Sequence, residues 1–257
     1  MDLISIIIPC YNHAAFLEQT VLSVIASDYP AIEIIIVDDG SKDDSVKIAR
    51  ELSEKYPIVR AIQQKNQGPA AARNNGIRMA AGSFILPLDA DDLISTDYIS
   101  RAMSEFKDEG VRLVYCNAEF FGKKTGIWNL KPFSLRSLAQ DNMIFCSAIY
   151  RKQDWEAVGG YDERMTWGWE DWEFWISLLK NEGKVIKLPI TGFYYRVRKN
   201  SRRKSTDKDA KEKTIQLINS KHKDFVYKYL NGPLHYQRSW SKRINLVKRL
   251  FGLKKNN

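Results

Sequence analysis

Residues 83–92, "SFILPLDADD", end an apolar run with three carboxylates, Asp89, Asp91 and Asp92. The apolar part has the length and composition of a strand buried on both faces. Carboxylates this close together repel one another, so a buried strand that ends in them needs a positive partner at that point. The stretch therefore predicts a strand of a central sheet with a cation-binding site at its end.

The chain before this stretch alternates similar apolar runs with helical patterns. Near-continuous Ile, Val and Leu runs separated by helices are typical of a parallel sheet covered on both faces. The expected strands are 3–9, 32–39, 59–64 and 83–89, and the expected helices are 14–27, 43–56 and 68–82. We therefore expect an α/β fold with a Rossmann-like, mostly parallel sheet and helices on both faces.

Polar clusters follow three of the expected strands. They are "CYN" at 10–12, "DDGS" at 38–41 and "DADD" at 89–92. Each alone is ordinary turn chemistry. The carboxyl ends of parallel strands, however, meet at one edge of the sheet, where α/β proteins bind ligands. The joint placement predicts a site at that edge.

Composition and charge narrow the classes of protein. The 257 residues suffice for one large domain, and no apolar run is long enough to cross a bilayer. Three cysteines without CxxC spacing argue against a disulfide framework and favour a cytoplasmic location. Of the net charge of +9, seven units come from residues 231–257, which contain no acid. We therefore expect no nucleic-acid partner for the main domain.

The alternation loosens after residue 110. We expect a strand over 111–121, a helix within 167–183 and a further pair of strands at 184–189 and 191–198. Residues 199–213 form a dense run of charge that we expect to be mobile.

The spacing of the acids suggests how they bind a cation. In an extended chain Asp89 and Asp91 point to one face and Asp92 to the other. Two carboxylates on one face make a hard oxygen site for Mn²⁺ or Mg²⁺, which completes its ligands with water and substrate phosphates. The alternative interpretation is an acidic turn and helix cap.

Five segments in this order resemble glycosyltransferase family 2. They are "SIIIPCYN", "IIIVDDGSKDDS", "NQGPAAARNNGI", "PLDADD" and "VGGYDERMTWGWEDWEFWISL". The resemblance covers about residues 3–200 and implies the GT-A fold: a nucleotide-sugar half at about 1–110 and an acceptor half at 111–200. Residues 201–257 then form a charged loop and a basic helical tail.

The resemblance also implies a set of site residues. Asp39 matches the acid that binds a uracil-type base, Asp89 and Asp91 match the DxD that binds ribose and metal, and Asp171 matches the catalytic base. The other matching donor-site positions are Pro9, Tyr11, Asn12, Asp38, Arg73 and Asn74.

One position departs from the family pattern. Many relatives carry a metal-binding His two residues after "YR", and Arg198 stands there. An arginine cannot ligate a metal but binds phosphate in a bidentate manner, so we expect a donor-diphosphate contact. The alternative is that Arg196 and Arg198 are charges on a surface strand.

The predicted base lies at a helix start, where the helix dipole favours its ionised form. Acids in a first helical turn also occur simply to complement that dipole, which is the alternative for Glu170 and Asp171. We assign Glu170, Trp167 and Trp169 to the acceptor site, since flat rings beside a base can stack on a sugar. The alternative is that the rings are only buried.

The tail carries an apolar stripe of Trp240, Ile244, Val247 and Phe251 among basic residues. Such a helix lies on an anionic membrane, so we expect a peripheral position on the inner face of the cell membrane. The alternative is that the stripe packs on the catalytic domain.

These features predict an inverting, metal-dependent glycosyltransferase. It would move one sugar from a nucleotide-diphospho-sugar, with a UDP-sugar favoured, to a glycan or lipid-linked acceptor in cell-surface polysaccharide synthesis. Processive synthases add membrane spans and a QxxRW motif, and neither is found in the sequence. The alternatives are a sugar nucleotidyltransferase and a non-catalytic GT-A scaffold protein.

Overall fold

The computed structural model describes residues 1–181, 183–198 and 208–250. In that part of the chain nine strands form one sheet in the order β3-β2-β1-β4-β8-β6-β9-β5, with β7 paired to β6. The strands are β1 (Ile4–Cys10), β2 (Ile32–Asp38), β3 (Val59–Gln63), β4 (Phe84–Pro87), β5 (Leu93–Ile94), β6 (Val111–Gly122), β7 (Gly126–Trp128), β8 (Ile149–Arg151) and β9 (Lys184–Val197).

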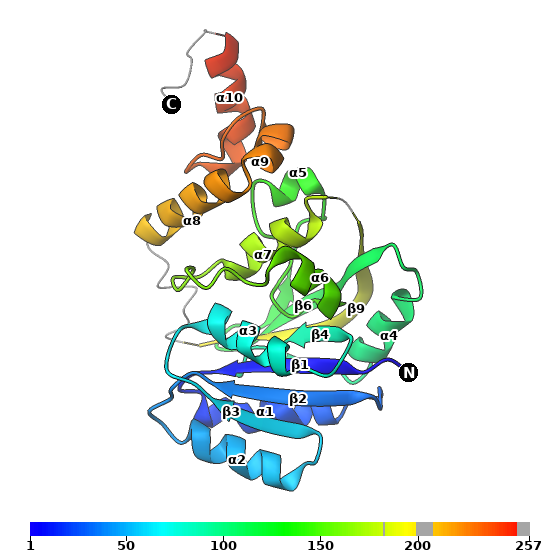
Figure 1. Ribbon diagram of the computed structural model, residues 1–257. Helices are drawn as coiled ribbons and strands as arrows, with labels where there is room; N and C mark the ends of the chain where they lie inside the picture. Colours follow the sequence, from blue (N-terminus) through cyan, green and yellow to red (C-terminus); the bar gives the residue numbers. More distant parts are fainter. Residues whose placement is uncertain (182, 199–207, 251–257) are drawn as a thin grey trace.

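Helices surround this sheet (Figure 1), and the C-terminal ones extend beyond it. They are α1 (Ala14–Ile25), α2 (Ser45–Lys55), α3 (Pro69–Met79), α4 (Tyr98–Glu105), α5 (Leu135–Leu138), α6 (Lys152–Val158), α7 (Glu170–Leu179), α8 (Lys208–Lys221), α9 (Lys223–Leu230), the 3₁₀-helix η2 (Arg238–Trp240) and α10 (Ser241–Leu250).

The first half of the chain confirms the predicted α/β fold. Strands β3, β2, β1 and β4 are parallel neighbours, and nearly every residue of β1 and β2 is buried. Helix α3 lies close to them because Gly76 has no side chain: a Cβ there would be 2.6 Å from Ile7 Cγ2 and 2.9 Å from Val37 Cγ2. Close packing of α3 brings Arg73 to the carboxyl edge of the sheet.

The second half is mixed rather than parallel. Strand β8 runs antiparallel to both β4 and β6, while β6 and β9 are parallel to each other. The expected pair of strands at 184–189 and 191–198 is wrong, because β9 is continuous from Lys184 to Val197. The sequence pattern predicted a break between residues 189 and 191. The structure has shifts in the register between β6 and β9 instead, and β9 continues through this point.

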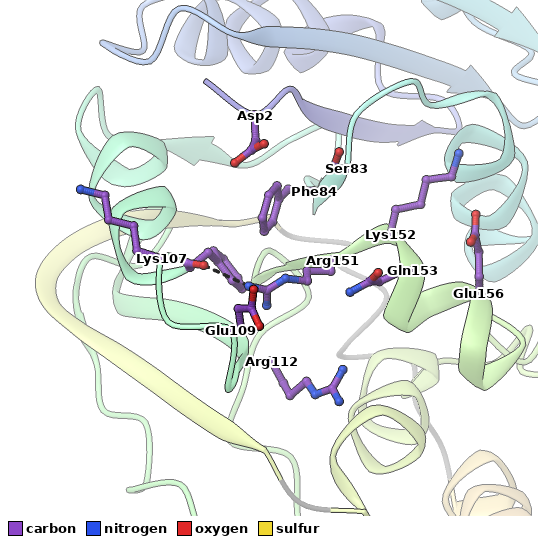
Figure 2. A pocket seen from close by; sticks show the side chains of 11 residues that line it. Asp2, Ser83, Phe84, Lys107, Glu109, Arg112, Arg151, Lys152, Gln153 and Glu156 are labelled. Carbon is purple, nitrogen blue, oxygen red and sulfur yellow. Dashed lines mark hydrogen bonds between the residues drawn. The ribbon is translucent and has the colours of Figure 1, made fainter.

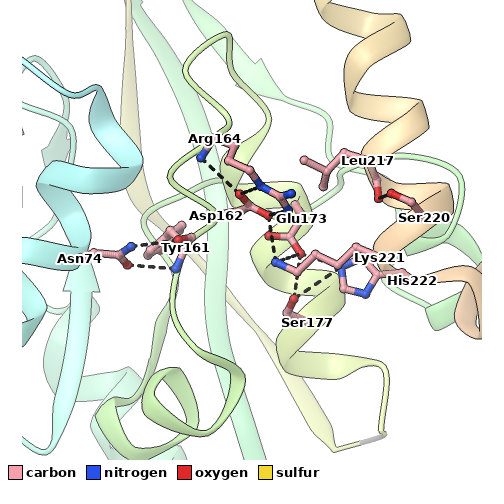
Figure 3. A network of polar contacts seen from close by, with 10 residues as sticks. All are labelled: Asn74, Tyr161, Asp162, Arg164, Glu173, Ser177, Leu217, Ser220, Lys221 and His222. Carbon is pink, nitrogen blue, oxygen red and sulfur yellow. Dashed lines mark hydrogen bonds and ion pairs between the residues drawn. The ribbon is translucent and has the colours of Figure 1, made fainter.

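The C-terminal helices attach to the sheet domain through α7. Glu173 of α7 is fully buried; it forms an ion pair with Lys221 Nζ at 2.9 Å and a hydrogen bond with His222 Nε2 at 2.6 Å (Figure 3). Lys221 Nζ also lies 3.2 Å from Asp162. The end of α8 is therefore bound both by α7 and by the loop that precedes α7.

The expectation of a mobile run over 199–213 is wrong for its last part, since α8 begins at Lys208. The remainder, 199–207, lies outside the described residues. Among the described helices none is both long and apolar enough to cross a membrane. The proposed division at residue 200 stays a prediction.

Candidate functional site

The loops that follow β1 and β2 are tied to each other. Asn12, at φ 56°, accepts a hydrogen bond from Lys42 N through Oδ1 at 2.8 Å, and its own N–H donates to Ser41 Oγ at 2.9 Å. Tyr11 is 41 % exposed beside it. Pro9 is buried within β1, opposite Val37. The two predicted loops therefore form one surface at the carboxyl edge.

The two acids after β2 organise this edge. Asp38 Oδ1 accepts from the N–H groups of Gly40 and Ser41, while its buried Oδ2 has no hydrogen-bond partner among the described residues. Asp39 accepts from Gln64 Nε2 and from the N–H groups of Gln67 and Gly68, each at 2.8 Å. The Asp39 carboxylate thus fixes the chain that enters α3.

Arg73 is the positive partner of the first acid in "DADD". Its side chain is 3 % exposed, and it binds Asp89 Oδ1 through Nη2 and Glu170 Oε1 through Nη1, both at 2.7 Å. Although burial alone would raise the pKa of Asp89, the charge of Arg73 lowers it. One guanidinium therefore joins the turn after β4 to the start of α7.

Arg198 is the partner of the second acid. Its Nε lies 2.7 Å from Asp91 Oδ2, at the end of β9. Burial raises the pKa of Asp91, against the opposing charges of His13 and Arg198. His13, in the loop after β1, is one of the groups that act on the pKa of Asp91.

The backbone of the acidic segment is a turn and not an extended chain. Asp92 N donates to Asp89 O at 3.0 Å, so the expected alternation of side chains does not apply. Asp92 is buried and accepts from Arg196 N at 2.8 Å, and burial followed by the charge of Asp91 raises its pKa well above the usual range. Arg196, whose Nε donates to Asp91 O at 2.7 Å, holds the turn and is no free surface charge.

A divalent cation fits this turn only with help from a ligand. No group of three or more His, Cys, Asp and Glu side chains suited to a metal occurs in the part of the chain that the structure describes. Two carboxylates are nevertheless what Mg²⁺ or Mn²⁺ needs when substrate phosphates and water complete the coordination. The donor set of Asp89 and Asp91 thus suits a metal that arrives with a diphosphate.

Asp171 lies next to the Arg73 bridge. Its Oδ1 accepts from Trp172 N and its Oδ2 from Asn142 Nδ2, both at 2.8 Å. Burial, followed by the negative charge of Glu170, raises the pKa of Asp171 to about 7. This direction is opposite to the one expected from the helix dipole, because desolvation favours the protonated acid.

Two residues expected to touch substrates are used within the fold. Asn74 donates to Tyr161 O and Glu163 Oε1 and accepts from Trp155 Nε1 and Tyr161 N, which fills its hydrogen-bonding capacity. Glu170, 8 % exposed, faces Arg73. Both residues join the two halves of the domain, and their assignment to the donor and acceptor sites stays a prediction.

The two tryptophans expected at the acceptor site contact the C-terminal helices. Trp167 Nε1 donates to Thr214 Oγ1 at 2.8 Å, and the guanidinium of Arg238 lies 5.9 Å from the Trp169 ring centroid. Trp169 has φ 60°, a strained conformation for a bulky residue. It redirects the chain into α7.

A pocket of about 720 Å³ lies at the opposite end of the sheet (Figure 2). Asp2 and Ser83 line it just before β1 and β4. Arg151 packs on the rings of Phe84 and Phe106 and donates to Val111 O. Since ligands of such sheets bind at the carboxyl edge, and none of the candidate site residues lines this pocket, we do not place the site there.

Comparison with known structures shows the same architecture. The crystal structure of S. aureus TarS 1–349 in complex with UDP-GlcNAc matches 99 % of this chain and 74 % of that chain, with a TM-score of 0.74 and 21 % identity. Mannosyltransferase PcManGT from Pyrobaculum calidifontis, in complex with GDP-Man and Mn²⁺, matches with a TM-score of 0.66 and 18 % identity, covering 100 % of this chain and 76 % of that chain. The fold is that of the GT-A glycosyltransferases.

Comparison of sequences gives the family. The model of "Glycosyl transferase family 2" matches residues 5–166, and that of "N-terminal domain of galactosyltransferase" matches residues 136–200. The chain belongs to glycosyl transferase family 2.

Relatives with curated descriptions include the uncharacterized glycosyltransferase YibD of Escherichia coli (strain K12), 34 % identical over 63 % of this chain and 45 % of YibD. Glycosyltransferase GlyA of Streptococcus pneumoniae is 29 % identical over 78 % of this chain and 31 % of GlyA. The chain spans less than half the length of each of these relatives.

Proposed function

We propose that the protein is an inverting glycosyltransferase that moves one sugar from a nucleotide-diphospho-sugar to a hydroxyl of a glycan or lipid-linked acceptor. The observation that carries the proposal is the Arg73 bridge. It places Asp89, of the donor turn, and Glu170, next to the proposed base, on one buried guanidinium. A donor group and an acceptor-activating group must lie this near for a direct displacement.

The donor binds at the carboxyl edge. Tyr11, Asn12, Asp38 and Asp39 line the nucleoside side, and the turn after β4 faces the diphosphate. We favour a UDP-sugar because Asp39 matches the family's base-binding acid. The structural neighbours are consistent with a nucleotide-sugar donor, since one is in complex with UDP-GlcNAc and another with GDP-Man.

A divalent cation, Mn²⁺ or Mg²⁺, would be held by Asp91 and Asp89. When bound it neutralises charge on the leaving diphosphate. Arg198 supplies a second positive group at the same place, 2.7 Å from Asp91, and its planar fork suits phosphate oxygens. PcManGT, whose structure contains Mn²⁺, supports a metal in this fold.

Asp171 acts as the general base. The acceptor oxygen forms a bond to the anomeric carbon as the bond from that carbon to the diphosphate breaks, and Asp171 takes the hydroxyl proton. A pKa of about 7 suits a base that works near neutral pH. A single displacement inverts the anomeric configuration.

The test is a screen of nucleotide sugars with Mn²⁺ or Mg²⁺, read out as released nucleoside diphosphate. We expect one donor to be consumed, and proton NMR of the product to show the anomeric configuration opposite to that of the donor. Retention of configuration would refute the mechanism. Release of the nucleoside diphosphate at the same rate with and without Mn²⁺ or Mg²⁺ would refute the cation site.

We also propose that α10 places the enzyme on an anionic membrane, near a lipid-linked acceptor. Polar residues attach this helix to the body: Asn245 Nδ2 donates to Leu230 O and Pro233 O. Trp240 of η2 is 54 % exposed, and Val247 and Leu250 of α10 are 50 % and 74 % exposed, whereas Ile244 of the predicted stripe is half-buried. Phe251, the last residue of the predicted stripe, lies outside the described residues.

Charge supports the same proposal. Lys242, Arg243, Lys248 and Arg249 accompany the stripe, and each basic residue near an anionic surface contributes about 1 kcal/mol. Figure 1 shows α10 at the end of the molecule remote from α2, where it can reach a surface.

Flotation with anionic and neutral liposomes tests the membrane proposal. We expect the full chain to float with anionic liposomes at low salt, and a variant ending at Gly232 to stay unbound. Equal flotation of both proteins, or no binding of the full chain, would contradict the role of α10.

A further inference from the structure

The carboxylate of Asp171 is held from two different parts of the chain. The bond from Trp172 N to Oδ1 is local to the start of α7. The bond to Oδ2 comes from Asn142, 29 residues earlier, in the loop after α5. Asn142 Oδ1 accepts from Ile144 N at 3.2 Å, so the amide NH₂ and not its oxygen faces Asp171. The orientation of the base therefore depends on that loop.

The loop is itself held by α7. Trp172 Nε1 donates to Leu138 O at 2.8 Å, and Trp175 Nε1 donates to Ile144 O at 3.2 Å. Both indoles are buried. These bonds fix the two ends of the segment that carries Asn142.

The middle of the loop is held by the C-terminal extension, which we define as residues 208–250. Arg238 Nη1 of η2 lies 2.9 Å from Asp141 Oδ1, and the same oxygen accepts from Asn142 N at 3.0 Å. The Arg238 guanidinium also lies 5.2 Å from the ring centroid of Trp172. Arg238 thus contacts both the residue before Asn142 and the residue after Asp171.

We infer that Asn142 is a positioning residue for the Asp171 base, and that Arg238 keeps Asn142 in place through Asp141. The role of Asp171 as base rests on the proposed function, whereas the hold of Asn142 on its carboxylate does not. A neutral donor stabilises the carboxylate form without forming an ion pair that would make its proton affinity too low. It also leaves the remaining lone pairs of Asp171 free to face an acceptor hydroxyl.

The charged and titratable groups around Asp171 set the background for this role. Glu170 faces it from α7, Arg73 from α3 and Cys146 from the loop that also carries Asn142. Glu170 and Arg73 are paired with each other. Replacement of Asn142 by Ala therefore changes the hydrogen bonding of Asp171 without changing any of these charges.

The experiment follows the titration of Asp171 by carbon-13 NMR of labelled aspartate carboxyls. The Asp171 signal is identified by its loss in Asp171→Asn. In the wild-type protein its midpoint should lie near 7, and in Asn142→Ala it should rise by about one pH unit, since one bond to a charged group is lost. The acid limb of the kcat profile should move by the same amount, with KM for the donor unchanged.

A second variant guards against misfolding. Asn142→Asp keeps an acceptor for Ile144 N but places a carboxylate against Asp171, so the midpoint should rise further than in Asn142→Ala. An unchanged Asp171 midpoint in both variants would overturn the inference.

The Arg238 step has its own test. Arg238→Ala should raise the midpoint by a smaller amount, and the double variant with Asn142→Ala should equal Asn142→Ala alone. Arg136→Ala is the matched control, because Arg136 is an exposed arginine on α5 that makes no ion pair among the described residues. An equal shift in Arg136→Ala, or additive shifts in the double variant, would overturn the role of Arg238.

The titration needs no substrate, so it separates the two proposals. A shifted midpoint in a protein that consumes no nucleotide sugar would reject the glycosyltransferase proposal and leave Asn142 as the group that holds Asp171. Normal transfer with an unshifted midpoint would reject the positioning inference alone.

Discussion

Asp89, after β4, and Asp171, at the start of α7, have different kinds of partner. Asp89 meets the guanidinium of Arg73, while Asp171 meets a neutral amide and a backbone N–H. The pKa of Asp89 is lowered, and that of Asp171 is raised to about 7. A charge-compensated acid stays ionised for binding, whereas an acid held by neutral donors can take up a proton near neutral pH. Asp91 is intermediate, because burial raises its pKa despite Arg198.

Removal of the cation that compensates two acids should have the largest effect. Arg73→Ala removes the buried cation that pairs with both Asp89 and Glu170, so we expect a loss of about 3–5 kcal/mol in the free energy of unfolding. Arg78→Ala is the matched control on α3, since its pair with Glu163 is exposed and contributes less than about 1 kcal/mol. Urea unfolding measures both. Similar losses of unfolding free energy in the two variants would mean that the ion pairs of Arg73 do not stabilise the fold.

Asp171→Asn should lower turnover and leave the affinity for the donor unchanged. The variant keeps the side-chain shape but cannot take the acceptor proton, so kcat should fall by about 100-fold or more. Affinity for the nucleoside diphosphate should stay unchanged, because the donor contacts lie at the other acids. Steady-state kinetics and calorimetry give the two values. More than a tenth of wild-type turnover would show that the base is another group.

Replacement of Asp91 should instead lower the affinity for the donor. Asp91→Ala removes a carboxylate of the proposed cation site, so affinity for UDP with Mn²⁺ should fall by about 30-fold or more. Asp44→Ala is the control, an exposed acid at the start of α2. Calorimetry measures both variants. Unchanged affinity in Asp91→Ala would remove the metal from the turn after β4.

The contrast between the two regions also decides what the sequence could predict. In the first half, strand periodicity and turn residues are local signals, so the strands, the helices and the polar loops at one edge follow from the sequence. The sheet confirms the order of β1, β2 and β4 and the fold that the resemblance implied. The sequence also places Asp39 and Asn12 at this edge, because each follows an expected strand.

The surroundings of Asp171 depend on contacts between residues that are far apart in the sequence. No local pattern marks Asn142, and Arg238 reaches Asp141 across 97 residues, the separation that also lies between Arg73 and Glu170. The pKa of Asp171 is set by burial, which a helix-start position does not reveal. Asn74 was matched to the donor site, yet its amide is filled by Trp155, Tyr161 and Glu163. These outcomes are fixed by tertiary packing and not by local sequence.

Measured per pH unit, the smallest expected effect is that of pH on the free energy of unfolding. The folded pKa of Asp171, about 7, exceeds the ordinary value of 3.8 for an aspartate. Between about pH 4 and 7 the native state therefore binds more protons at this site than the unfolded state does. The contribution of Asp171 to stability is present below this window and declines as the pH rises through it, by at most about 1.4 kcal/mol per pH unit.

Asp171→Asn removes this dependence, so its free energy of unfolding relative to wild type should increase from pH 4 to 7 and stay level above pH 8. Urea midpoints across that range measure the difference between the two proteins. For Asp89, whose pKa is lowered, the sign is opposite: its contribution is present above about pH 4 and is lost at lower pH. A pH-independent difference between wild type and Asp171→Asn would mean that folding leaves the pKa of Asp171 unshifted, and the contrast between the two kinds of acid would fail. A rising difference would show that the fold stabilises the protonated form of the proposed base at the expense of the charged form.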